Sequence, residues 1–191
     1  MKMPLNYPVL YKMLDSRAEA TIASAVQTAV ADAESLWAPE KFDGVFPVKG
    51  FGIKRLQPRD LAGSNATTTT LIGPIVSAWQ FSIATAETWA DAIHQAVLSD
   101  SAYVVLTGVY NFDATPDVEA IKIIADGIEY PTMDITEIYG WDVATAYFSH
   151  PIIVRPEKMI TIKAKCRTAG LKSFGFMGYT IAKRSYLIGE I

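Results

Sequence analysis

Histidine and cysteine, the residue types that most often build metal sites and nucleophilic centres, are scarce in this sequence. The chain has two histidines, His94 and His150, and a single cysteine, Cys166. A histidine metal site needs two or more ligands at a short spacing, whereas these two histidines lie far apart on different predicted elements. A single cysteine can form neither an internal disulfide nor a cysteine-rich zinc site. We therefore predict no metal ligands and no cofactor.

The carboxylates and serines give no specific indication of catalysis. A carboxylate pair for glycoside hydrolysis could be drawn from Glu119, Glu129, Asp134 and Glu137, but any β-sandwich offers as many pairs. No serine lies in the G-x-S-x-G context of a hydrolase nucleophile. The GFGIK segment lacks the following helix of a phosphate-binding loop. We predict no catalytic residues and no enzymatic activity; an active site assembled across subunits is the enzymatic alternative.

The overall composition favours a protein that neighbours partly cover. Half of the 191 residues are apolar and only 19% are charged, a low charge density for a free monomer. The formal net charge of −3 predicts no direct contact with nucleic acid, since phosphate binding depends on clustered Lys and Arg. No segment approaches the ~18 consecutive apolar residues of a membrane helix. Pro4, Asn6 and Pro8 interrupt the N-terminal segment, so we predict no secretion signal, no membrane contact and folding in the cytoplasm.

Residues 1–43 are predicted to form an extended arm and an amphipathic helix. Two prolines interrupt the arm, residues 1–15, which also carries Tyr7 and Tyr11. Ser16, with Glu19 three residues later, forms the capping-box pattern that begins a helix. Apolar residues then recur at spacings of three and four along one side until Pro39 ends the pattern. This apolar seam consists of Ile22, Val26, Ala29, Ala33 and Leu36.

Residues 44–191 carry the pattern of a β-sandwich. Glycine and proline recur between short runs rich in Val, Ile, Thr and aromatic residues. The predicted strands lie near residues 51–56, 67–72, 75–83, 103–110, 118–124, 127–129, 133–138, 145–148, 152–154, 159–166 and 174–181. A helix is predicted at residues 85–100, because Trp89, Ile93 and either Ala96 or Val97 share a helical face. Short strands without βαβ alternation predict a mainly β protein, an antiparallel jelly-roll sandwich of about eight strands with an N-terminal arm and helix.

The segment YFSHPIIVRPEKMITIKAK, residues 147–165, shows how this sandwich is patterned. Pro151 and Pro156 are predicted to bound a short edge strand, since proline cannot donate to a ladder. His150, held extended by the proline that follows it, is predicted to be structural or interfacial rather than catalytic. In the next strand the apolar residues Ile160, Ile162, Ala164 and Cys166 alternate with Thr161, Lys163, Lys165 and Arg167. The basic side is predicted to face solvent or a partner.

The C-terminal half resembles a known class of proteins in the order of these features. A strand leads to DGIEYP in VEAIKIIADGIEYPTMDITEIY, a turn and strand follow in HPIIVRP, then the alternating MITIKAK strand and a glycine-spaced strand in SFGFMGYTI. In this order, over about residues 115–182, the chain resembles the jelly-roll head proteins of tailed bacteriophages, especially the trimeric cement or decoration proteins of icosahedral capsids. The resemblance implies no catalytic residues and a role in bridging neighbouring capsomers.

From the composition and this resemblance we expect a virion structural protein on the capsid surface, made in the host cytoplasm. Its expected partners are the major capsid protein and further copies of itself, as a trimer. The predicted capsid or subunit interface consists of Tyr7, Tyr11, Ile22, Val26, Ala29, Ala33, Leu36 and Trp37. Two alternatives are a jelly-roll coat subunit that forms the shell and a carbohydrate-binding or receptor-binding sandwich. The latter would use exposed aromatic residues such as Trp37, Tyr110, Tyr139 and Trp141.

Overall fold

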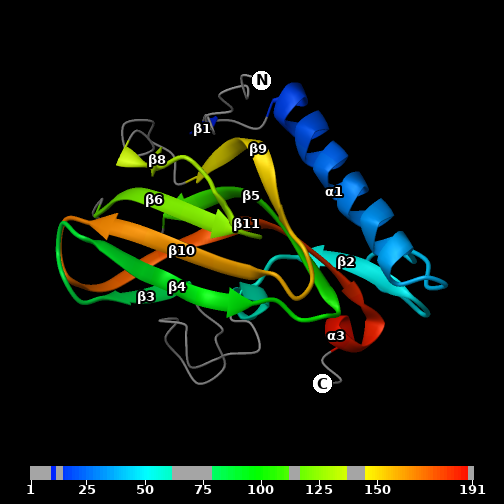
Figure 1. Cartoon of the computed structure of the whole chain (residues 1–191). Helices are drawn as coiled ribbons and strands as arrows, with labels where there is room; N and C mark the ends of the chain where they lie inside the picture. The colour runs from blue at the N-terminus through cyan, green and yellow to red at the C-terminus, as the bar shows by residue number, and fades with distance from the viewer. Residues whose placement is uncertain (1–9, 12–14, 62–78, 112–116, 137–144, 189–191) are drawn as a thin grey trace, which may run out of the picture.

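The protein folds into two stacked antiparallel sheets with a long helix on one outer face (Figure 1). This computed structural model describes residues 10–11, 15–61, 79–111, 117–136 and 145–188. The helices are α1 (Ser16–Leu36), a 3-10 helix η1 (Pro58–Leu61) and α3 (Arg184–Ile188). The strands are β1 (Leu10–Tyr11), β2 (Phe51–Arg55), β3 (Gln80–Ile83), β4 (Trp89–Val97), β5 (Ala102–Asn111), β6 (Val118–Ala125), β7 (Ile128–Glu129), β8 (Met133–Asp134), β9 (Thr145–Val154), β10 (Met159–Cys166) and β11 (Gly170–Lys183).

The strands form two sheets with a defined pairing order. The first sheet has the order β1-β9-β5-β11-β2, with β3 also paired to β11. The second has the order β4-β10-β6-β7, with β8 also paired to β6. Every strand pair is antiparallel. The prediction of a mainly β, antiparallel fold is therefore confirmed.

Apolar residues on both faces of the first sheet divide the core into two layers. Val104 and Leu106 of β5 belong to the large cluster between the sheets. Tyr103 and Val105, the alternate residues of the same strand, belong to a second cluster under α1. A strand buried on both faces reads as a continuous apolar run rather than an alternating one. This explains the run AYVVL at the start of β5.

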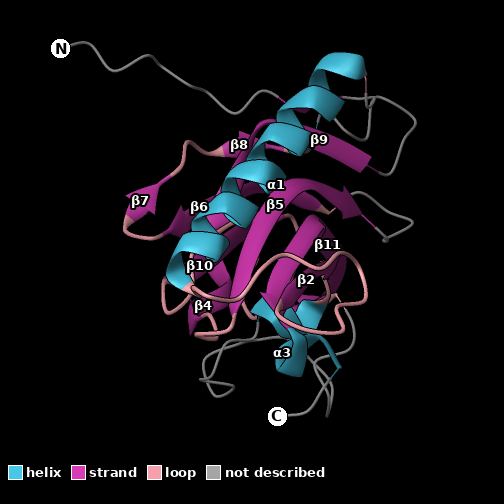
Figure 2. Ribbon diagram, turned by 90° about the vertical axis from the view of Figure 1, so that its right-hand side faces the viewer, coloured by secondary structure: helices cyan, strands magenta, loops and turns pink. Residues whose placement is uncertain are grey.

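Helix α1 lies across the outer face of the first sheet, over β5 and β9 (Figure 2). Ala29 and Ala33 are fully buried, and small side chains allow the helix to lie close to the strands. Trp37 then packs edge-on against Phe51 and Tyr103, with ring centroids 5.3 Å and 5.5 Å away. The sequence predicted Ser16 as the N-cap, but the residue before it has this role.

The cap is Asp15, whose carboxylate accepts a hydrogen bond from the backbone N–H of Ala18 at 2.7 Å. Aspartate and serine satisfy the unpaired N–H groups of a first turn about equally well, so the DS pair offered two possible starts. The helix therefore includes Ser16 as its first residue.

The helix predicted at residues 85–100 is wrong, because this segment forms strand β4. Its pairing with β10 shifts register twice, so that β4 holds two extra residues opposite Ile160–Lys163 of its partner. The buried residues of β4 are consequently Ala92, Ile93 and Ala96, spaced by one and three positions. A β-bulge interrupts the alternation of buried and exposed residues along a strand. In β4 the resulting spacing of buried residues resembles that of a helix.

Two short strands were predicted where the structure has one long strand, β9. Its pairing with β5 passes from Ile152 opposite Leu106 to Tyr147 opposite Gly108, so several residues of β9 bulge out around Pro151. Proline is tolerated in a strand at such a bulge, because no ladder donor is needed there. His150 lies in this bulge and is exposed.

A fully buried carboxylate, Asp60 of η1, joins elements that lie far apart in the sequence. Its Oδ1 accepts from Lys54 Nζ at 2.8 Å and from the Tyr186 hydroxyl at 3.0 Å. Its Oδ2 accepts from the Gln57 N–H at 2.9 Å and from the Thr180 hydroxyl at 2.8 Å. Burial, and then the charge of Asp60, raise the pKa of Tyr186. The carboxylate thus joins β2, β11 and α3 to η1.

We expect Asp60→Ala to lower the free energy of unfolding by about 3 kcal/mol, because it leaves the half-buried Lys54 without its partner. Urea denaturation followed by circular dichroism measures this change. The control is Glu129→Ala, which breaks a more exposed pair with Lys122 and should change the free energy of unfolding by less than about 1 kcal/mol. Equal losses in the free energy of unfolding for the two variants would show that Asp60 contributes no more to stability than an exposed ion pair does.

Candidate functional site

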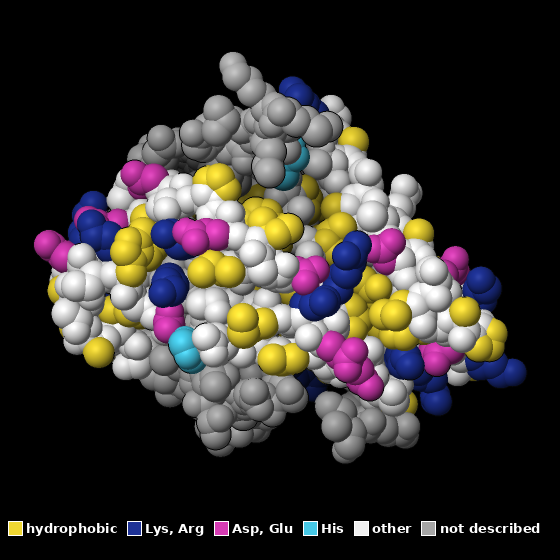
Figure 3. Space-filling model, in the orientation of Figure 1, with side chains coloured by type: hydrophobic (Ala, Val, Ile, Leu, Met, Phe, Trp, Pro, Cys, Tyr) yellow, Lys and Arg dark blue, Asp and Glu magenta, His cyan; other side chains and the backbone are white. Residues whose placement is uncertain are grey.

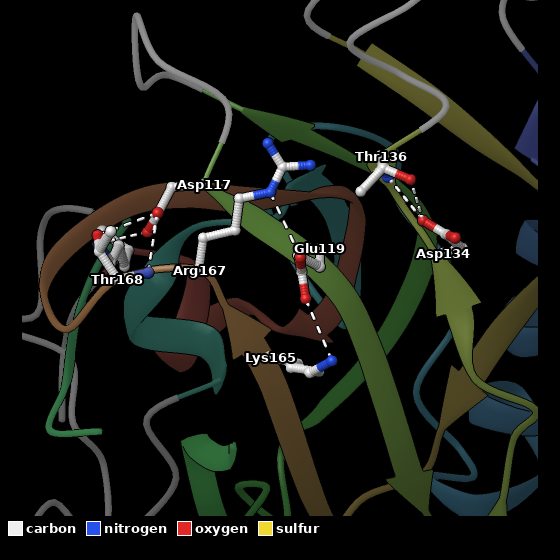
Figure 4. Close-up of polar contacts among 8 residues, drawn as sticks. Asp117, Glu119, Asp134, Thr136, Lys165, Arg167 and Thr168 are labelled. Carbon is white, nitrogen blue, oxygen red and sulfur yellow. Dashed lines mark hydrogen bonds and ion pairs between the residues drawn. The ribbon is translucent and has the colours of Figure 1, made fainter. Parts of the chain in front are cut away.

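The polar side chains around the start of β6 form hydrogen bonds and ion pairs with one another (Figure 4). Asp117 accepts hydrogen bonds from the N–H and the hydroxyl of Thr168, at 3.1 Å and 3.0 Å, and pairs with the buried ammonium of Lys172. Glu119 lies between Lys165 and Arg167, 3.3 Å from each. These carboxylates already have their cationic partners, so the geometry indicates a structural role for them.

The basic face predicted for β10 is balanced by carboxylates of the neighbouring strands. Besides the contacts of Glu119, Lys163 Nζ lies 3.7 Å from Asp91 Oδ1 on β4. Figure 3 shows positive, negative and hydrophobic side chains interspersed over this sheet. The predicted apolar face is confirmed, since Ile160, Ile162, Ala164 and Cys166 are fully buried. On the other face the prediction was wrong for Thr161, which is buried under β4 and accepts a hydrogen bond from the Gln95 N–H. The opposite face, however, is not a concentrated positive patch.

Each histidine has a polar partner on its own strand. His94 Nδ1 lies 2.6 Å from Asp91 Oδ2, and His150 Nδ1 lies 3.0 Å from the hydroxyl of Ser149. Both histidines are exposed. Among the residues that the structure describes, no three His, Cys, Asp or Glu side chains are grouped so that they could hold a metal ion.

The predicted interface residues separate into buried and accessible sets. Ala29, Ala33 and Trp37 are covered by this chain's own first sheet, because the seam of α1 packs on the strands. Leu36, at the end of the helix, is 59% exposed. Ile22 and Val26 line a groove described below. Tyr7 lies outside the described residues, and for Tyr11 the structure describes only the backbone, which pairs with Tyr147.

The aromatic residues considered for sugar binding do not form an exposed platform in the described ranges. Trp37 is only 6% exposed, so its predicted exposure was wrong. Tyr110 packs edge-on against Trp79, with ring centroids 6.4 Å apart, and burial raises its pKa. Tyr139 and Trp141 lie outside the described residues.

The two most exposed large apolar side chains among the described residues, Phe46 and Val48, occur in the segment that joins α1 to β2. We call residues 41–50 the apolar loop. Val45 is 58%, Phe46 90% and Val48 76% exposed, and Lys41 and Lys49 lie beside them. Hydrophobic and basic side chains gather at the right-hand end of Figure 3, where Figure 1 places this segment. Exposed apolar side chains grouped in this way make the loop a candidate interaction surface.

Backbone hydrogen bonds fix the shape of the apolar loop. The Asp43 carboxylate accepts from the N–H groups of Val48 and Lys49, at 2.7 Å and 3.0 Å. The loop is also bonded to β2 through Phe51 N–H and the Lys41 carbonyl, 3.3 Å apart. Gly50 has a φ of 73°, and a Cβ there would collide with the Lys41 carbonyl. These contacts hold the backbone on both sides of Phe46, whose side chain is 90% exposed.

A groove of about 940 Å³ lies between the N-terminal half of α1 and the outer face of the first sheet. Ile22, Ala23 and Val26 form its helix side. Its sheet side carries Arg55 and the tyrosines Tyr110, Tyr147 and Tyr179. Tyrosine and arginine are enriched where interfaces gain most of their binding energy. The groove and the apolar loop lie toward opposite ends of the same helix.

Sequence reasoning missed the apolar loop, although the segment GVFPVKG contains a usable signal. Three large apolar residues occur within four positions, between two glycines and directly before Lys49. In the sequence the glycines and prolines that recur from residue 44 onward predict only turns between short strands. A run of apolar residues in a turn region follows neither the helix nor the strand period that would direct its side chains into the core. Such a run is therefore a candidate for surface exposure.

The order of the apolar loop should depend on pH through Asp43. The two backbone hydrogen bonds, from Lys49 and Val48, lower the pKa of Asp43 below its usual value of 3.8. A lowered folded-state pKa means that the stabilisation is present above the unfolded value and is lost as pH falls through the folded value. We expect the Val48 and Lys49 amides to lose hydrogen-exchange protection below about pH 4, and Asp43→Asn to remove this pH dependence. Unchanged protection down to pH 2 would contradict the role of Asp43.

None of the helices in the described ranges is both long and apolar enough to cross a membrane. Comparison of the chain with known proteins identified no relative. No model of a protein family matches it, and neither a curated protein nor a solved structure is similar to it. The phage head-protein resemblance therefore remains a prediction, and the function is argued from the geometry of this chain.

Proposed function

We propose that this chain is a virion structural protein, a capsid decoration protein that binds the outside of an icosahedral phage head and bridges capsomers. The observation that carries the proposal is the hydrogen-bonded apolar loop, in which Phe46 is 90% exposed. A side chain of this type, held out by backbone hydrogen bonds, loses little entropy on docking and can anchor a protein interface.

We further propose that the sandwich is a jelly roll, and the order of its strands supports this. With strands numbered along the chain, a jelly roll pairs its first, eighth, third and sixth strands in one sheet and its second, seventh, fourth and fifth in the other. Counting β3 as first, and β8 as an addition to its sheet, these orders correspond to β3-β11-β5-β9 and β4-β10-β6-β7. On this assignment β1 and β2 extend the first sheet.

Jelly rolls occur in viral capsid proteins, in lectins and in cupin enzymes. A lectin site requires an accessible aromatic platform; Trp37 is buried, and Tyr110, Tyr147 and Tyr179, which line the groove, are only partly exposed. The exposed aromatic side chain of the apolar loop is instead flanked by valines, which suits a protein surface better than a sugar. This contrast favours an assembly role over the carbohydrate-binding alternative.

We expect Phe46→Asp to weaken binding to capsids about tenfold to a hundredfold, since burial of a phenylalanine contributes about 1.5–3 kcal/mol. The measurement is co-sedimentation of the purified chain with undecorated heads of the virus that carries its gene. The melting temperature should stay unchanged, because the side chain is exposed. The matched control, Ile128→Asp, changes another exposed apolar residue on β7 and should bind like the wild type.

A wild-type chain that does not sediment with heads would contradict the decoration role. Closed shells formed by the chain alone, seen by electron microscopy, would instead support the coat-subunit alternative. Saturable binding of a glycan, with no binding to heads, would support the receptor-binding alternative.

A further inference from the structure

We propose that the side chains of Lys172 and Asp117 condense with each other and form an amide bond that joins the two sheets covalently. Asp117 directly precedes β6 of the second sheet, and Lys172 lies in β11 of the first sheet. Both reactants lie within this chain. The inference does not rest on the proposed function, and it uses neither the apolar loop nor the groove.

Both reacting side chains are shielded from water. The Lys172 side chain is 7% exposed and the Asp117 side chain is 12% exposed. A buried ion pair recovers the cost of its desolvation only when hydrogen bonds satisfy the remaining polar atoms of both groups. Condensation replaces the two buried charges with one neutral amide, and the exclusion of water limits hydrolysis of that amide.

The contact between the two groups differs from an ordinary salt bridge. Lys172 Nζ contacts Asp117 Oδ2. Among the residues that the structure describes, however, Oδ2 is the one buried polar side-chain atom without a hydrogen-bond partner. The nitrogen therefore lies against the carboxyl group outside hydrogen-bond geometry. Such proximity of two reactants can correspond to an effective concentration of about 10⁵–10⁸ M.

A second shielded pair, Lys54 and Asp60, provides a contrast. Its side chains are 16% and 0% exposed, and Lys54 Nζ donates an ordinary hydrogen bond to Asp60 Oδ1 at 2.8 Å. Each oxygen of Asp60 accepts two hydrogen bonds. Burial and an ion pair are therefore common to both sites, and the unsatisfied oxygen distinguishes Asp117.

Backbone contacts hold the carboxyl group of Asp117 in place before the reaction. The Asp117 carbonyl accepts from the Arg167 N–H at 2.9 Å, and its Oδ1 accepts from the Thr168 N–H at 3.1 Å. These bonds anchor Asp117 to the turn between β10 and β11 (Figure 4). Because the carboxyl group is already fixed, little freedom is lost when the amine attacks it.

The hydroxyl of Thr168 provides a path for the proton that must move. Lys172 Nζ donates to this hydroxyl at 2.7 Å, and the hydroxyl donates to Asp117 Oδ1 at 3.0 Å. Transfer of one proton along this path converts the ammonium into an amine and the carboxylate into a carboxylic acid. A positioned side chain of this kind assists proton transfer in many active sites.

The bond then forms between two neutral groups. The lone pair of Lys172 Nζ attacks Asp117 Cγ and makes the new C–N bond. The bond from Cγ to Oδ1 breaks, and the hydroxyl leaves with one amine proton as water. The products are one amide and one water molecule, and no atom changes its oxidation state.

Intact-mass spectrometry of the purified, denatured full chain tests for the bond. We expect the wild type to be lighter than the mass of its sequence by one water molecule. Lys172→Arg keeps the positive charge but removes the amine, so it should have its full sequence mass, as should Asp117→Ala. The matched control is Lys54→Arg, which changes the other shielded pair and should retain the loss of one water.

Digestion with trypsin locates the bond. Trypsin does not cleave after an acylated lysine, so the linked chain should yield one branched peptide that joins residues 60–122 to residues 168–183. The Lys172→Arg chain should yield no such branched peptide. A loss of water carried by any other peptide would overturn the assignment to this pair.

Variants of Thr168 test the proton path. Thr168→Val should be recovered mainly with its full mass, whereas Thr168→Ser keeps a hydroxyl and should remain linked. A fully linked Thr168→Val chain would overturn the role of the hydroxyl. A wild-type chain with its full sequence mass would overturn the inference as a whole, and so would a loss of water that persists in Lys172→Arg.

Discussion

Burial of the first sheet on both faces is the constraint on which the rest of the structure depends. One face of β5 packs against the second sheet through Val104 and Leu106, and the other packs against α1 through Tyr103 and Val105. An exposed face of this composition would favour aggregation, so α1 is a required layer of the core. Its position in turn fixes the groove on one side and the apolar loop at its end.

Because of this constraint, the two predicted units, residues 1–43 and 44–191, share one buried core. The predicted N-terminal unit holds Ala29, Ala33 and Trp37, and these share one buried cluster with Phe51 and Ile181 of the predicted sandwich unit. Removal of the helix would uncover those side chains. The helix is therefore unsuitable as a detachable docking arm, and point changes at exposed positions are better probes of assembly.

The sequence predicted those parts of the fold that follow a regular period. In β10 the apolar face was read correctly, since Ile160, Ile162, Ala164 and Cys166 are fully buried. In β4 two bulges displaced the buried residues, and the strand was read as a helix. Strand register and bulges depend on the partner strand, which a single sequence does not reveal.

The site was predicted less well than the fold for a related reason. The seam of α1 was correctly identified as apolar, yet apolarity alone does not distinguish a surface that packs within the chain from one that binds a neighbour. Ala33 and Phe46 are both apolar, but one is fully buried and the other is 90% exposed. The difference arises from hydrogen bonds to Asp43 and from the backbone at Gly50, which are local geometry rather than composition.

The apolar loop also restricts how copies of the chain can associate. The edge of β2 that does not face β11 is bonded by this loop, through Asp43 N–H to the Phe51 carbonyl at 2.9 Å and Ile53 N–H to the Gly44 carbonyl at 3.0 Å. An edge covered in this way cannot pair with a strand of another copy. Association at this end of the molecule must therefore use side chains, and the side chains most exposed there are those of Phe46 and Val48. The same segment thus covers this edge of β2 against strand pairing and leaves Phe46 and Val48 exposed.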